Sequence, residues 1–139
     1  MTTTTRPELS KKNEYYLEKH RYYELKHFCL QYSTWKKAYV ALDGLSRRPD
    51  DLVIFSQTNK IADPTAKCVE ARDYYSERMR MIEEAAKCTD EYIGSYILKA
   101  VTEGRTYENL RSVHNIPIGR EAYYKLYRKF FWILSKLRD

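Results

Sequence analysis

A chain of 139 residues with 43% hydrophobic and 32% charged side chains is long enough for one domain, or one small domain with an appended hairpin. Four glycines and four prolines in the whole chain favour long helices and few turns, so we expect an all-α fold. No stretch approaches the roughly 20 apolar residues that a membrane-spanning helix needs, and the threonine-rich start lacks the apolar core of a signal peptide. We therefore expect a cytoplasmic protein that has no membrane partner.

The positive charge is concentrated near the carboxyl end of the chain. The formal net charge is +6. Residues 105–139 contain eight Lys and Arg against three Asp and Glu, whereas residues 1–104 contain seventeen against sixteen. This asymmetry favours a polyanionic partner. A solvated basic face without any partner would produce the same imbalance and, on charge alone, is the more common case.

The sequence lacks the patterns of catalytic and metal-binding sites. It has no phosphate-binding glycine loop, no zinc-protease histidine pair and no ordered serine, histidine and acid. An odd number of cysteines argues against a disulfide framework. We expect no enzyme, no cofactor and no metal, because no ligand spacing relates the cysteines and histidines, which are Cys29, Cys68, Cys88, His20, His27 and His114.

A first long helix is expected from Glu8 to about Leu42, after residues 1–7, which carry no helical pattern and are expected to be disordered. Its apolar and aromatic residues alternate spacings of three and four, as in a heptad seam. Packing of this seam within the chain is the simpler interpretation, and contact with a second copy or another protein is the sharper one. The residues predicted to form this interaction seam are Phe28, Tyr32, Trp35 and Tyr39.

A second long helix is predicted from Pro64 to about Lys87. Asp63 is suited to cap this helix, and a proline is tolerated at its first position because the missing amide has no partner there. Gly44 should end the first helix, which leaves residues 44–63 as a linker. Two long helices joined by such a linker pack most simply antiparallel, so residues 8–88 are expected to form a helical hairpin.

Residues 89–139 are predicted to form a trihelical unit that contains a helix-turn-helix. Thr89-Asp90-Glu91 should cap a helix over residues 90–103. Gly104 should end this helix, because glycine readily adopts the left-handed conformation of a helix C-terminus.

The next helix is short and leads into the turn of the predicted helix-turn-helix. Thr106 is suited to cap it, and Leu110 and Val113, three residues apart, should face inward together. Residues 114–115 break the helix, and Ile116 should fill the angle between this helix and the last one. Short helix, apolar turn and longer basic helix together favour a DNA-binding helix-turn-helix.

The last helix, which begins at Ile118 or Gly119, has the pattern of a recognition helix over residues 119–131. Its expected buried side consists of Ala122, Tyr123, Leu126, Phe130, Ile133, Leu134 and Leu137. Phe131 and Trp132, on the flank of this helix, are expected to pack against the first long helix, with a dimer contact as the alternative. Cationic side chains on the other side can reach base edges and phosphates in the major groove. That outer side is expected to carry Arg120, Glu121, Tyr124, Lys125 and Arg128. A helical hairpin that binds nothing is the alternative.

Three segments resemble the ArpU/RinA-like phage regulators, which carry a helix-turn-helix similar to region four of sigma factors. The segments are Ile61–Thr65 with the helix that follows it, Asp90–Tyr107, and Ile116–Tyr124. The resemblance covers roughly residues 61–137 and implies a phage or prophage protein that activates late genes, with host RNA polymerase as a further partner. The tyrosine-rich first helix has no counterpart in the family.

The resemblance also implies roles for single residues. Arg120, Tyr124, Lys125 and Arg128 would carry recognition of double-stranded DNA. The start of the preceding helix would add further DNA contacts through Arg105, Thr106 and Tyr107, of which Thr106 and Tyr107 would contact phosphates. Glu121 departs from the family pattern by placing a negative charge near the groove, where it would accept a hydrogen bond from cytosine or cap the helix.

Two functions of different classes follow from the sequence. The first is a sequence-specific DNA-binding transcription regulator, and a homodimer would match paired half-sites. The second is a helical protein-interaction module that acts through the interaction seam, such as a phage assembly or terminase-associated component or an inhibitor of a host protein.

Overall fold

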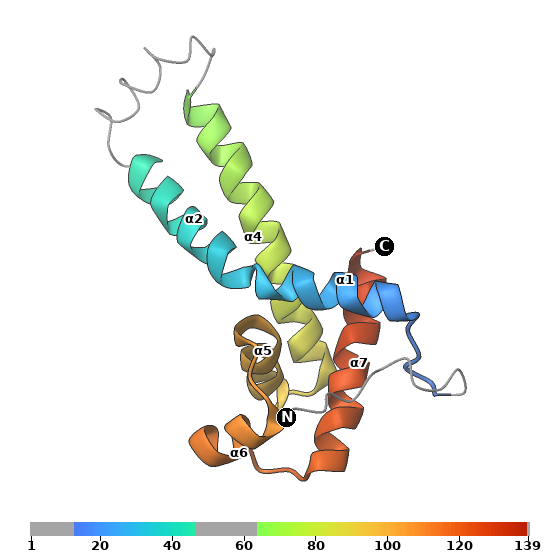
Figure 1. Ribbon diagram of the computed structural model, residues 1–139. Helices are drawn as coiled ribbons and strands as arrows, with labels where there is room; N and C mark the ends of the chain where they lie inside the picture. Colours follow the sequence, from blue (N-terminus) through green and yellow to red (C-terminus); the bar gives the residue numbers. More distant parts are fainter. Residues whose placement is uncertain (1–12, 47–63, 139) are drawn as a thin grey trace. The chain divides into compact units, whose positions relative to one another are not determined.

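The computed structural model describes residues 13–46 and 64–138, and all the regular secondary structure in this part of the chain is α-helical, which confirms the predicted all-α class (Figure 1). The expectations for residues 1–7, for the linker after Ser46 and for the Asp63 cap lie outside the described residues. The helices in chain order are α1 (Lys19–Leu30), α2 (Tyr32–Ser46), α4 (Pro64–Thr89), α5 (Gly94–Glu103), α6 (Tyr107–His114) and α7 (Arg120–Arg138).

Two compact units make up the chain. The first combines Met1–Gln31 with Met81–Asp139, and the second is Tyr32–Arg80. The expected boundary at residues 88–89 is therefore replaced by two breaks, one before Tyr32 and one after Arg80, and α4 contributes to both units.

The expectation of one continuous helix over residues 8–42 is wrong. α1 begins only at Lys19, and the chain leaves the helix at Gln31, whose amide donates to the Phe28 carbonyl at 3.2 Å and tightens the last turn. α2 then continues past Gly44 to Ser46. The break divides the predicted interaction seam, because Phe28 lies on α1 in the first unit and the other three residues, Tyr32, Trp35 and Tyr39, lie on α2 in the second.

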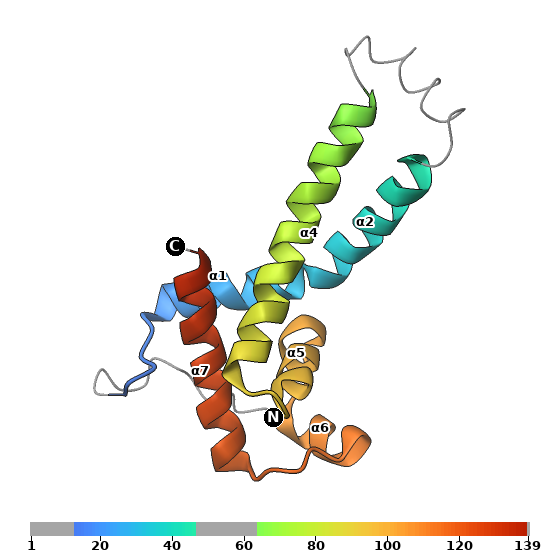
Figure 2. The same ribbon diagram turned by 180° about the vertical axis from the view of Figure 1, so that it is seen from behind.

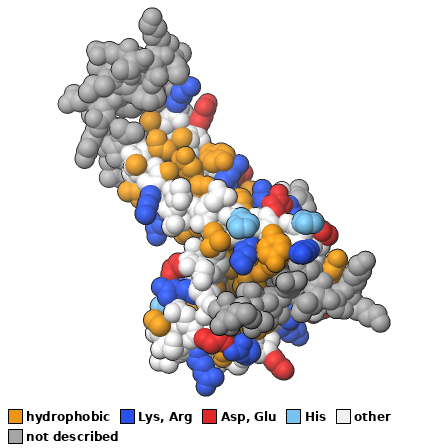
Figure 3. Space-filling view, viewed as in Figure 1, with side chains coloured by type: hydrophobic (Ala, Val, Ile, Leu, Met, Phe, Trp, Pro, Cys, Tyr) orange, Lys and Arg blue, Asp and Glu red, His pale blue; other side chains and the backbone are white. Residues whose placement is uncertain are grey.

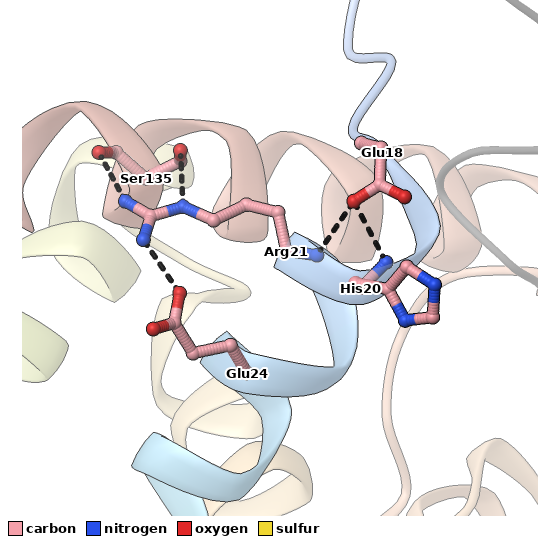
Figure 4. Close-up of polar contacts among 5 residues, drawn as sticks. All are labelled: Glu18, His20, Arg21, Glu24 and Ser135. Carbon is pink, nitrogen blue, oxygen red and sulfur yellow. Dashed lines mark hydrogen bonds and ion pairs between the residues drawn. The ribbon is translucent and has the colours of Figure 1, made fainter.

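In the first unit, the guanidinium of Arg21 fastens α1 to α7 through polar contacts (Figure 4). Arg21 donates from Nε to Ser135 Oγ and from Nη2 to the Ser135 carbonyl, both at 3.2 Å, and pairs with Glu24 at 2.6 Å. Glu18 starts α1, since one carboxylate oxygen accepts from the backbone amides of His20 and Arg21. The cap and the Ser135 contacts together set the register of α1 along α7.

Aromatic rings form the core between α1 and α7. Tyr22 and Phe131 are both buried and meet edge to face, with 5.2 Å between their centroids. The hydroxyls of Tyr22 and Tyr127 share a hydrogen bond of 3.1 Å, which gives each buried ring the polar partner it requires. Phe131 packs against the first helical segment as expected, whereas the Trp132 ring lies 5.7 Å from Tyr15, ahead of α1.

The start and end of α5 follow local chemistry. Asp90 accepts hydrogen bonds from the amides of Tyr92 and Ile93 at 2.8 and 2.9 Å, and these bonds lower the pKa of its carboxyl. Asp90, one of the three residues expected to cap this helix, therefore stabilises the turn ahead of α5, whereas the helix itself begins at Gly94 rather than at residue 90 and has no side-chain cap. Gly104 ends α5 in the left-handed conformation, with φ of 71°, as predicted.

The second unit contains α2 and the part of α4 up to Arg80. The two helices run side by side in opposite directions in both views (Figures 1 and 2). Arg72 Nη2 donates to Tyr39 Oη at 3.3 Å, and its guanidinium lies 5.1 Å from the Tyr39 ring centroid. Trp35 and Cys68 are buried here.

Gly94 marks a close approach of α5 to the end of α4. A Cβ added at Gly94 would lie 2.5 Å from the Ala86 carbonyl oxygen, a backbone atom that cannot rotate away. We expect Gly94→Ala to lower the free energy of unfolding by about 1–3 kcal/mol, because the backbones must separate. Urea denaturation followed by circular dichroism measures this change.

Gly119→Ala is the matched control. No atom lies within 4 Å of a Cβ at Gly119, and its φ is not positive, so the substitution should leave stability unchanged or raise it by up to about 1 kcal/mol. Equal losses at both glycines would contradict a specific contact at Gly94.

Candidate nucleic-acid interface

Local capping bonds build the connection between α6 and α7. Thr106 Oγ1 accepts from the Asn109 amide at 3.2 Å, as the sequence predicts. Asn115 adopts the left-handed conformation with φ of 53°, and the Ile116 amide donates to the Leu110 carbonyl at 3.2 Å. Ile116 is buried in the angle of the turn, as expected. Val113, which was expected to face inward, is 60% exposed.

Tyr107 fixes α6 against the start of α7. Its ring lies 5.3 Å from the Tyr123 ring, and its hydroxyl donates to the Ile118 carbonyl at 2.7 Å. Because the side chain is only 4% exposed, the expectation that Tyr107 contacts phosphate is wrong. The hydroxyl instead donates to the Ile118 carbonyl in the turn, and this bond restrains the direction of α7 relative to α6.

The buried face of α7 is rotated relative to the expected one. Tyr124, predicted on the outer side, is 8% exposed and packs its ring 5.0 Å from Tyr123 and 6.1 Å from Tyr127. Large amphipathic rings bury more apolar area than the aliphatic side chains that were expected inside. The buried residues of α7 are Tyr123, Tyr124, Tyr127, Phe130, Phe131, Leu134 and Ser135, whereas Ala122, Leu126, Ile133 and Leu137 are exposed or half-buried.

Three of the predicted cations gather in one cleft at the start of α7. The cleft has a volume of about 500 Å³, and Lys125 is exposed while Arg128 is half-buried. Glu14, from the segment ahead of α1, also lines the cleft and was not anticipated. Its lining residues are Asn13, Glu14, Tyr15, Arg120, Glu121, Tyr124, Lys125 and Arg128, so two carboxylates accompany three cations.

Arg120 is held by a carboxylate on α6. Its guanidinium forms an ion pair with Glu108 and lies 5.5 Å from the centroid of the Tyr107 ring. Both charged side chains remain 55% exposed, so the pair is a surface interaction that contributes little to stability. Any anionic ligand of this arginine would therefore have to compete with Glu108.

A second cleft of about 480 Å³ lies between α6 and the start of α7. Arg111, which is exposed, lines it together with Glu108 and Arg120 and was missed by the sequence reasoning. Arg111 follows Glu108 by three residues, a spacing that places both side chains on one face of α6, and this spacing was the available signal. In Figure 3, Lys and Arg side chains alternate with Asp and Glu over the lower part of the view, where α6 and the start of α7 lie in Figure 1.

Arg105 and Thr106 are engaged in contacts with their neighbours. Arg105 donates from Nε to Glu103 and from Nη1 to Asn109 Oδ1, both at 2.7 Å, and the first of these bonds lowers the pKa of the Glu103 carboxyl. The Arg105 side chain is 32% exposed, and Thr106 serves as the helix cap. Neither residue lines the two clefts described above; both line a third cleft, together with Lys26 and Tyr123.

The described residues contain no group of three or more His, Cys, Asp and Glu side chains arranged to hold a metal ion. Among the same residues, no helix combines the length and apolar composition that crossing a bilayer requires. Cys29 and Cys68 are buried and Cys88 is exposed, and burial raises the pKa of the Cys29 thiol.

No known protein family, curated protein or solved structure matches this chain.

Removing the Tyr107 hydroxyl tests how the two helices are joined. Tyr107→Phe leaves the Ile118 carbonyl without its donor, so we expect the free energy of unfolding to fall by about 0.5–1.5 kcal/mol. Tyr92→Phe removes a hydroxyl from a side chain that is 81% exposed and should change nothing. Chemical denaturation of both variants makes the comparison, and equal stability of the two variants would contradict the role of this bond.

Proposed function

We propose that the protein is a sequence-specific regulator that binds double-stranded DNA, with residues 119–131 at the start of α7 as the recognition helix. The observation that carries this proposal is the exposed, cationic first turns of α7, set at a fixed angle to α6 by the Tyr107–Ile118 hydrogen bond. Such an arrangement suits insertion of one helix into the major groove while the other spans the backbone.

Separate roles for the side chains follow from their positions. Arg120 and Lys125, on the exposed side of α7, would contact base edges or phosphates, and Arg111 on α6 would contact the backbone. Tyr107 and Tyr124 would act indirectly: because both side chains are buried, they would position α7 and would not contact DNA themselves.

Carboxylates near the cations favour selective binding over tight general binding. Glu14 and Glu121 lie in the cleft with Arg120, Lys125 and Arg128, and they repel phosphate wherever the cations do not meet it. Unfavourable charge contacts of this kind discriminate against incorrect partners. Glu121 retains the further option of accepting a hydrogen bond from the cytosine amino group.

We further propose, on the resemblance of residues 61–137 to the ArpU/RinA-like regulators, a phage or prophage origin, late genes as targets and host RNA polymerase as a partner. Selection of bound sequences from random duplexes by the purified protein, read at two salt concentrations, tests the DNA-binding proposal. An enriched motif supports it, and no enrichment at either salt concentration would contradict it.

Arg120→Ala should weaken binding to the selected DNA by about 1–3 kcal/mol and relax the preference at one base position, as expected for an arginine that contacts a base edge. Fluorescence anisotropy with selected and random duplexes measures both effects. Lys36→Ala, which removes an exposed cation from the second unit, is the control and should leave the preference intact. Equal losses on the two duplexes would make Arg120 a phosphate contact instead.

Glu108→Gln should have the opposite effect, because it releases Arg120 from its internal partner. We expect affinity for the selected duplex to rise by up to about fivefold, the equivalent of the 0.2–1 kcal/mol that an exposed ion pair contributes. Glu91→Gln makes the same change in net charge at an exposed position outside both clefts. Equal gains in the two variants would show that net charge alone is responsible.

A further inference from the structure

We propose that the α2–α4 hairpin of the second unit is a docking surface for a second copy of this chain, with which it forms an antiparallel four-helix bundle. The inference concerns only α2 and the part of α4 up to Arg80, and it does not depend on DNA binding. Its starting point is a hairpin with two rows of uncharged side chains on α2, of which the row that contains Tyr39 contacts α4 and the other is largely exposed.

Because this hairpin has only two helices, part of its apolar surface remains exposed to solvent. Among the described residues of the second unit, Trp35 and Cys68 are the buried hydrophobic side chains, while Tyr74 is 48% exposed. Hydrophobic side chains are visible at the surface along this hairpin (Figure 3). Amphipathic helices normally bury such a surface against further helices, as in a four-helix bundle.

Helical spacing identifies the open face. On α2, Trp35, Tyr39 and Leu42 follow spacings of four and three and face α4. A second row with the same spacing, Thr34, Ala38 and Ala41, lies beside the first, where Thr34 and Ala41 are exposed and Ala38 is half-buried. A helix with two adjacent rows of this kind contacts two neighbouring helices.

The matching row on α4 carries one large aromatic side chain and two cations. Lys67, Ala71, Tyr74 and Arg78 recur at spacings of four, three and four, which places them on one face. The Arg78 guanidinium lies 3.4 Å from the centroid of the Tyr74 ring, so the two side chains form one stacked surface. By helical spacing, this row and the Thr34 row lie on the same flank of the hairpin.

The opposite flank of the hairpin differs. Arg72 closes it by donating to Tyr39 across the two helices, and Lys36 places a charge there. Val40 and Val69 lie toward that side by helical spacing, at 62% and 47% exposure.

The two rows complement each other when one copy faces another across a twofold axis parallel to the helices. The Arg72–Tyr39 contact shows that positions 72 and 39 lie at the same height. In antiparallel helices, with equal rise per residue, Ala38 then lies at the height of residues 73–74. A twofold axis along the bundle would place α2 against α4 of the second copy, so each Tyr74 would face an Ala38 of the other.

Charge supports the same pairing. Lys37 lies on the outward edge of α2, and Glu70 and Glu77 lie on the outward edge of α4, all of them exposed. Placing α2 beside α4 of a second copy would bring these opposite charges together at both edges of the interface. Ala38 and Tyr74 are therefore matched in size, and Lys37 is matched in charge with Glu70 and Glu77, between the same patch on both copies, as an isologous contact requires.

Sedimentation equilibrium of the full chain tests this proposal without DNA. We expect a dimer at concentrations of about 10–100 μM, and at least a tenfold weaker dimer for Ala41→Glu, which places a charge on the proposed face. Val40→Glu is the matched control, since it adds the same charge at the neighbouring exposed residue toward the opposite flank, and it should dimerise like the unmodified chain. A monomeric unmodified chain over this range, or equal losses in both variants, would overturn the proposal.

Exchanging the sizes of the side chains at positions 38 and 74 distinguishes an effect on dimerisation from an effect on folding. Ala38→Tyr alone should weaken the dimer at least tenfold, and the double variant Ala38→Tyr with Tyr74→Ala should recover most of that loss, because large and small side chains again face each other. Circular dichroism confirms that each variant retains its helices. A double variant that is folded but no better than Ala38→Tyr would overturn the proposed pairing of α2 with α4 of the second copy.

Discussion

The contact between Tyr107 and α7 holds the helix-turn-helix in shape, and the position of every candidate DNA-binding residue depends on it. The hydroxyl bond to Ile118 ties the first residue of α6 to the turn, while the ring packs against Tyr123. Together these contacts restrict both the direction and the rotation of α7. The side of α7 that carries Lys125 faces solvent because the side that carries Tyr123 and Tyr127 is occupied.

Tyrosine rather than phenylalanine suits this core for a physical reason. Burial raises the pKa of the Tyr123 and Tyr127 phenols and therefore favours the neutral form of both rings. Neutral hydroxyls can still form hydrogen bonds, and the Tyr22–Tyr127 pair does so at 3.1 Å inside the unit. A directional bond inside an aromatic core selects one packing arrangement among several of similar area.

Features set by neighbouring residues were predictable, whereas those set by distant contacts were not. The Thr106 cap, the Gly104 terminator and the Asn115 break depend on side chains within a few positions, and the sequence identifies all three. The break at Gln31 has no glycine or proline to mark it. It coincides with the boundary between the two units, so tertiary packing overrides a helical pattern there.

The same distinction applies to the candidate site. Exposed cations such as Lys125 were assigned to the outer side of α7 because long charged side chains are rarely buried. Tyr107 and Tyr124 were misassigned because tyrosine suits both core and surface, and only the packing partner decides between them. Glu14 could not have been placed at all, since it joins the cleft through contacts more than a hundred residues apart in sequence.

The pairing of Arg120 with Glu108 also bears on how ionic strength would act on the protein. Added salt weakens an arginine–phosphate contact, but it equally weakens the internal pair that must open first. Weakening the phosphate contact lowers the affinity for DNA, whereas weakening the internal ion pair raises it. This arginine would therefore add less to the salt dependence of DNA affinity than an unpaired cation does. If the proposed DNA contact is made, its affinity would therefore change less with ionic strength than the affinity of a contact made by an unpaired arginine.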